Sequence, residues 1–109
     1  MNSNINNQSK KIVRIMGLGQ FEINIEDLRR INEIDNQIVK LLENRGNNES
    51  IEYEFKKQLE LLDKMVREKG IAIDSKEILP SDVVLPNEDI TLEEARMVFK
   101  GDGAIKDSF

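Results

Sequence analysis

The spacing of the hydrophobic residues in this 109-residue chain changes near Glu26, and that change constrains the fold more than any other feature. Before it, apolar and polar residues alternate, with Phe21, Ile23 and Ile25 on one face of a half-buried strand. After it, apolar residues recur every three or four positions, which predicts an amphipathic helix that ends near Asn44. The chain is therefore predicted to begin as sheet and continue as helix, in an α+β fold.

A β-hairpin is predicted at the start of the folded part. Residues 12–16 form a short segment rich in β-branched side chains, and Gly17-Leu18-Gly19 separates this segment from the alternating run. Gly17 and Gly19 suit a tight turn because glycine adopts positive φ without steric cost. The same glycines could suggest a phosphate-binding loop, but the third glycine of that motif is missing and another strand follows, so the turn is favoured.

A second long helix is predicted to start with Ser50 as its N-cap and to stop at Gly70. Two amphipathic helices joined by a short connector normally fold back antiparallel, because each buries its apolar side against the other or against the sheet. Several acid-first pairs four residues apart, Asp63 with Arg67 among them, are expected on solvated faces.

Asp35 lies inside the first predicted helix between two apolar residues, so we expect it to be at least partly buried. A buried carboxylate needs a partner, because an unpaired buried charge is costly. Arg14 on the hairpin is the predicted partner.

The C-terminal part is predicted to hold a short third strand at a sheet edge and a short helix. Val83-Val84-Leu85 is the strand, and Pro86 directly after it would blunt that edge. Thr91 and Glu94 have the spacing of a capping box, which predicts a helix over residues 92–100 that Gly101 ends.

The chain length suits one domain with one core. Residues 1–10 are polar and are predicted to form a flexible leader. A single α+β domain is predicted over residues 11–105, followed by a tail over residues 106–109.

Composition excludes most enzyme classes. The chain has no Cys and no His, so it lacks a thiolate nucleophile, an imidazole base and the preferred ligands of zinc and other transition metals. No carboxylates stand at a recognisable catalytic spacing. We therefore expect no enzymatic activity, no cofactor and no metal.

Charge and hydropathy limit the partners. The formal net charge of −5 disfavours nucleic acid and anionic membrane surfaces, which attract concentrated Lys and Arg. No apolar run approaches the roughly 20 residues that span a bilayer. We expect a cytoplasmic protein without direct membrane insertion, which reaches a membrane only through a partner.

Four blocks of sequence, in this order, resemble the PspAA family of PspA-associated proteins. They are Ile12-Val13-Arg14-Ile15-Met16-Gly17 with Gly19-Gln20-Phe21; Asn32-Glu33-Ile34-Asp35; Val66-Arg67-Glu68-Lys69-Gly70; and Ser81-Asp82-Val83-Val84-Leu85-Pro86 with Asp89-Ile90-Thr91-Leu92-Glu93-Glu94-Ala95-Arg96. Within these blocks, the residues expected to have structural roles are Gly17, Gly19, Asp35, Ser81, Asp82, Pro86, Thr91 and Glu94. The polar leader and the ending at Ala104-Ile105-Lys106 depart from the family pattern.

The resemblance implies an accessory role in a phage-shock-type envelope-stress response. The implied associate is phage-shock protein A, a long helical membrane-remodelling protein, and no catalytic residues are implied. An alternative is an antitoxin-like or regulatory dimer that controls a nucleic-acid-binding partner.

Two contact surfaces are open to such a protein. One is the hairpin edge, which could accept a strand from a partner or from a second copy in a homodimer; its candidate contact residues are Ile12, Arg14, Met16 and Gln20. The other is a helix face that docks on a coiled-coil partner. We favour the hairpin edge, because Ile12 and Met16 are expected on the less-covered side of the sheet.

Overall fold

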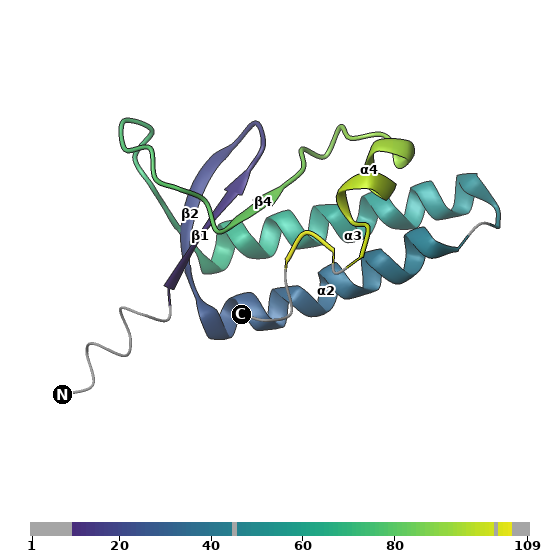
Figure 1. Ribbon diagram of the computed structural model, residues 1–109, viewed down its shortest axis with the longest axis horizontal. Helices are drawn as coiled ribbons and strands as arrows, with labels where there is room; N and C mark the ends of the chain where they lie inside the picture. The colour runs from purple at the N-terminus through teal and green to yellow at the C-terminus, as the bar shows by residue number, and fades with distance from the viewer. Residues whose placement is uncertain (1–9, 45, 102, 106–109) are drawn as a thin grey trace.

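The predicted hairpin is formed by β1 (Lys10–Ile15) and β2 (Gly19–Asn24), which pair antiparallel with Val13 opposite Phe21 (Figure 1). The turn between them depends on its glycines, because Gly17 has a φ of 88° and Gly19 a φ of 130°. This confirms the prediction of a glycine turn. The computed structural model describes residues 10–44, 46–101 and 103–105.

Two further strands complete a four-stranded sheet in the order β3-β2-β1-β4. The predicted edge strand is β4 (Val83–Leu85), which runs parallel to β1. The other, β3 (Ile71–Ala72), pairs antiparallel with β2 and was not predicted, because two residues are too few to show a period.

The open hairpin edge expected at β1 is not present, because β1 is an interior strand between β2 and β4. Asp82 extends the pairing of β1 with β4 at one end: its N–H donates to the Ile12 carbonyl at 2.8 Å, and its Oδ2 accepts from the Ile12 N–H at 2.8 Å. At the other end, the Met16 N–H donates to the Leu85 carbonyl at 2.9 Å. The β1 backbone is thus hydrogen-bonded on both sides within the chain.

The two long helices form the predicted antiparallel hairpin and cover one face of the sheet (Figure 1). They are α2 (Ile25–Glu43) and α3 (Asn48–Lys69). The prediction of Ser50 as N-cap is wrong, because the Asn47 side chain accepts from the N–H groups of Glu49 and Ser50 and starts α3 earlier.

Gly70 ends α3 as predicted, and its lack of a side chain is required by a close approach to β2. A Cβ at this position would lie 2.7 Å from the Val66 carbonyl oxygen and 3.0 Å from the Phe21 Cβ. Only glycine lets the chain leave α3 and enter β3 along the edge of β2.

The core lies between the sheet and the helices, and α4 (Leu92–Val98) closes it at one end (Figure 1). The rings of Phe55 and Phe99 meet edge to face, with centroids 6.1 Å apart, and both are buried. The capping box of Thr91 and Glu94 is confirmed, although α4 ends with Phe99 as C-cap, before the predicted end at Lys100.

Asp35 is fully buried, but its predicted partner is wrong. Its carboxylate accepts from the N–H groups of Ala104 at 3.0 Å and Ile105 at 3.2 Å, which docks the C-terminal segment onto α2. A side chain at Gly103 would overlap the same carboxylate. Arg14 cannot reach it, because Val13 and Ile15 face the helices and Arg14 alternates to the opposite face of the sheet.

The predicted tail (residues 106–109) and nearly all of the predicted leader (residues 1–10) lie outside the described residues. Lys10 is the exception, because it is the first residue of β1.

Candidate protein-contact surface

The face of the sheet that points away from α2 and α3 is called here the outer face. The strand register places Ile12 and Arg14 of β1 on it, with Val84 beside Arg14 on β4 and Ile71 on β3. Ile71 is 66% exposed and Val84 48% exposed. Apolar β-branched side chains therefore face solvent on a surface that no helix of the described chain covers.

The segment 73–82 crosses part of the outer face on its way from β3 to β4 (Figure 1). Gln20 fixes it there: its Nε2 donates to the Leu79 carbonyl at 2.6 Å and to the Ser81 Oγ at 2.9 Å, and its Oε1 accepts from the Leu79 N–H at 3.2 Å. The Gln20 backbone carbonyl also accepts from the Ile73 N–H at 2.9 Å. This one side chain satisfies both backbone groups of Leu79 and bonds to the Ser81 hydroxyl, in a strap that has no regular structure.

Gln20 was expected to contact a partner, but its side chain is only 5% exposed and is used within the chain. Ile12 and Arg14 lie partly buried on the outer face, and Met16 is exposed in the turn after β1. Ile12, Arg14 and Gln20 thus share the outer face, where Gln20 anchors the strap, and Met16 lies apart from them in the turn.

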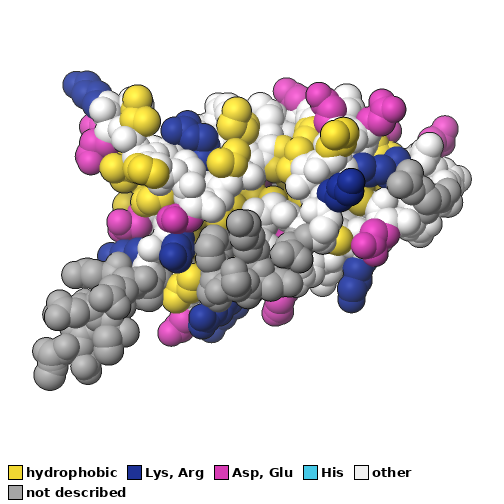
Figure 2. All heavy atoms as spheres, viewed as in Figure 1, with side chains coloured by type: hydrophobic (Ala, Val, Ile, Leu, Met, Phe, Trp, Pro, Cys, Tyr) yellow, Lys and Arg dark blue, Asp and Glu magenta, His cyan; other side chains and the backbone are white. Residues whose placement is uncertain are grey.

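The strap adds exposed apolar groups next to the outer face. Ile78 is 81% exposed and Leu79 is partly exposed, and hydrophobic side chains gather near the strap and the hairpin turn in Figure 2. We call Ile71, Ile78, Leu79 and Val84 the outer patch. The sequence could have revealed Val84, because the alternation of Val83-Val84-Leu85 turns its middle residue outward.

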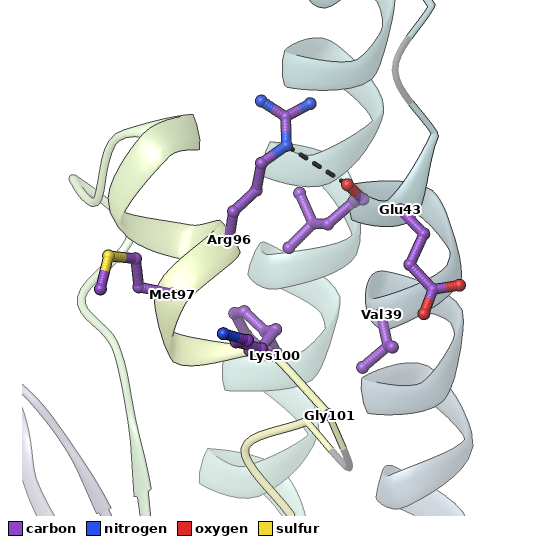
Figure 3. Close-up of a pocket in the computed structure, with 8 residues that line it drawn as sticks. Val39, Glu43, Arg96, Met97, Lys100 and Gly101 are labelled. Carbon is purple, nitrogen blue, oxygen red and sulfur yellow. Dashed lines mark hydrogen bonds between the residues drawn. The ribbon is translucent and has the colours of Figure 1, made fainter.

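A hollow lies between the C-terminal end of α2 and the helix α4 (Figure 3). It has a volume of about 340 Å³, and Val39, Glu43, Met97 and Lys100 line it together with Arg96. Arg96 is occupied there, because its Nε donates to the Leu42 carbonyl at 3.2 Å and its Nη2 to the Asn44 carbonyl at 3.5 Å. These bonds satisfy carbonyls at the C-terminus of α2, so Arg96 acts as a structural cap.

Asp63 is the second buried acid, and it was expected on a solvated face paired with Arg67. Its side chain is fully buried, and Arg67 Nε donates instead to the Asp63 backbone carbonyl at 3.4 Å. Burial, and after it the negative charge of Glu88, raise the pKa of the Asp63 carboxyl against the opposing effect of Arg67, and the result is a pKa of about 7. The spacing in the sequence could have revealed this burial, because Asp63 follows Phe55 and Leu59 at intervals of four residues on the apolar side of α3.

Within residues 10–44, 46–101 and 103–105, no group of three or more acidic side chains is arranged to hold a metal ion. In the same part of the chain, no helix combines the length and the apolar character needed to cross a bilayer.

Residues 11–107 match the sequence model of the family PspAA, described as PspA-Associated protein. Comparison with curated proteins finds no match, and comparison with solved structures finds none either. The family description names an association with another protein and no reaction. The match spans nearly the whole chain, and the chain therefore belongs to the PspAA family of PspA-associated proteins.

Proposed function

We propose that this chain is a non-catalytic accessory protein of a phage-shock-type envelope-stress response, and that it acts by binding PspA. The observation that carries the proposal is the family match over residues 11–107, whose description is an association with PspA. We further propose that it works in the cytoplasm without a cofactor and reaches the membrane only through its partner.

The outer patch is our proposed contact surface for PspA. A partner that is a long helical protein presents an apolar stripe along each helix, and a sheet face with Ile71 and Val84 exposed is complementary to such a stripe. Interface cores need apolar groups that are exposed before binding and buried afterwards. Ile12 and Arg14 of β1, together with Glu22 of β2, lie between Ile71 and Val84 on the outer face and would be buried with them.

The exposed sides of the long helices are weaker candidates. Tyr53 and Leu61 on α3 are exposed, but they are eight residues apart in the helix and are flanked by charged residues. Lys57 lies over the Tyr53 ring, with Nζ 5.4 Å from the ring centroid, so this aromatic side chain already has a cationic neighbour. An isolated exposed apolar residue is normal on a soluble surface.

The proposal is tested by mixing the full chain with purified PspA from the same genome and measuring the masses of the species by size-exclusion chromatography with light scattering. A defined complex that contains both proteins is the expected result. Two separate peaks at concentrations above ten micromolar, roughly the range of weak specific complexes, would overturn it. The chain alone, measured in the same run, reports whether it forms a homodimer.

The antitoxin-like alternative predicts a different partner. Affinity purification from the native host, with the full chain as bait, would then recover a basic nucleic-acid-binding protein in place of PspA. A purified complex with that protein would favour the alternative.

A further inference from the structure

A cavity of about 220 Å³ lies beside the hairpin turn. One wall is the turn itself, over residues 15–18, and the other is the loop over residues 87–89, with Asp63 of α3 also lining it. The walls are in close contact, because a Cβ at Gly17 would lie 2.6 Å from the Asn87 Nδ2. Asn87 also accepts from the Asp89 N–H at 2.9 Å through its Oδ1, which fixes the loop.

The Asp63 carboxylate in this cavity has no hydrogen-bond partner among the residues that the structure describes. Asp63 is fully buried, and neither of its carboxylate oxygens receives a hydrogen bond from any described residue. Arg67, the cation on the next turn of α3, donates to the backbone carbonyl of Asp63 and not to the carboxylate. A buried polar group normally has a partner, and a bound ion or ligand is one way in which such a group is satisfied.

The other lining residues define what that ligand must be. Glu88 and Asp89 also line the cavity, and none of its lining residues is Lys or Arg. A cationic ligand complements this acidic lining. Because no group of acids in the described part of the chain is arranged for a metal ion, an organic cation fits better than a metal.

The rim of the cavity is apolar. Met16 and Leu18 line it and are each about half exposed. A ligand with an aliphatic stem and a charged head matches an apolar rim above an acidic floor, and the lysine side chain has this form. Its ammonium group has three donors, enough for Asp63 and Glu88 together.

We propose that this cavity receives the side-chain ammonium group of a lysine from a protein partner, with the Asp63 carboxylate as its acceptor. The lysine stem would lie against Met16 and Leu18, and its head would replace the missing hydrogen-bond donor of Asp63. The proposal rests on the proposed function in one respect only, namely that the lysine belongs to the protein that the chain binds.

The cavity is tested first without any partner. The isotope-labelled full chain is titrated with butylammonium, which reproduces the end of a lysine side chain, and with butanol, its neutral counterpart, while backbone amide shifts are recorded by NMR. Saturable shifts at residues 16–18 and 87–89 with butylammonium alone are expected. Asp63→Asn should abolish them, and Glu60→Gln, an exposed acid on the same helix, should leave them unchanged.

The pH dependence of butylammonium binding is a further test of the same site. The groups that face the cavity are Asp63, Glu88 and Asp89, with Arg67 on the adjacent turn of α3. Because the ionised carboxylate is the acceptor, butylammonium should bind more tightly at about pH 8 than at about pH 6. The absence of saturable shifts, or equal shifts in the Asp63→Asn variant, overturns the proposal.

The second arm uses purified PspA. If the wild-type chain binds PspA, Asp63→Asn should weaken binding by about tenfold or more, and Glu60→Gln should not. Unchanged affinity of the Asp63→Asn variant overturns the lysine site and leaves the proposed function intact. If the wild-type chain does not bind PspA, the proposed function fails, and the butylammonium titration still decides whether the cavity takes an amine.

Discussion

Three polar residues, Gln20, Asp35 and Asp63, are buried in this small protein, and their hydrogen bonding differs. Gln20 bonds to a strap that crosses the sheet, and Asp35 bonds to backbone N–H groups of the C-terminal segment. Both partners are about 60 to 70 residues away in sequence, so each side chain fixes a long-range contact that has no regular secondary structure. Asp63 differs, because its carboxylate bonds to no described residue.

Replacement of Asp35 by Ala should release the C-terminal segment. The N–H groups of Ala104 and Ile105 would lose their acceptor, and we expect the free energy of unfolding to fall by about 2–3 kcal/mol. Urea denaturation measures the loss, and hydrogen exchange should show faster exchange at Ile105. Asp35→Asn keeps one acceptor oxygen, so its free energy of unfolding should lie between those of the wild type and Asp35→Ala. Equal stability of all three proteins would contradict the role assigned to this carboxylate.

Replacement of Asp63 by Asn should stabilise the fold as the pH rises. The pKa of this acid is about 7 in the folded chain and near 3.8 when unfolded, so its ionisation opposes folding. Stability of the wild type should therefore fall between about pH 4 and pH 7 and level off above, while the variant lacks this loss. We expect the variant to be more stable by about 1–3 kcal/mol at pH 8 and closer to the wild type at pH 4. A constant difference across this range, measured by urea denaturation, would contradict the buried carboxyl.

At the scale of elements, the sequence predicted the helices and strands whose formation depends on residues close to one another along the chain. The hairpin, both long helices, the edge strand and the capping box of α4 each follow from spacing, turn glycines or capping residues. The pairing of β4 with β1, the strand β3 and the partner of Asp35 depend on segments far apart in sequence. No local pattern encodes those contacts, which is why the open edge at β1 was predicted wrongly.

The capping box sets the start of α4. The Glu94 N–H donates to the Thr91 Oγ at 3.1 Å, and the Thr91 N–H donates to Glu94 Oε1 at 3.1 Å, which lowers the pKa of Glu94. Thr91→Ala should destabilise the chain by about 1 kcal/mol in urea denaturation. The share that Glu94 contributes is present above its ordinary pKa and should be lost as the pH falls through its lowered value. Glu94→Gln should remove that acid dependence, and an unaltered pH profile in this variant would contradict it.

At the scale of the whole molecule, the helices and α4 cover one face of the sheet and the outer face stays partly open (Figure 1). The sequence predicted that a less-covered side of the hairpin would carry the contact, and it placed Ile12 and Met16 there; in the structure Ile12 lies on the outer face and Met16 lies in the turn. It could not show that Gln20 would be used to hold the strap, or that Ile71 and Ile78 would join Val84, because both depend on how the strap crosses the sheet.

The central claim is that the outer patch binds PspA, and one pair of variants tests it directly. Val84→Glu places a charge on the outer patch, and Leu61→Glu places the same charge on α3 at a similar exposure, 48% against 43%. Isothermal titration calorimetry with purified PspA should show affinity reduced by about tenfold or more for Val84→Glu, because binding would have to remove the new carboxylate from water even with Arg14 beside it, and affinity near the wild type for Leu61→Glu. Equal affinity of Val84→Glu and the wild type, or a selective loss in Leu61→Glu, would contradict the account.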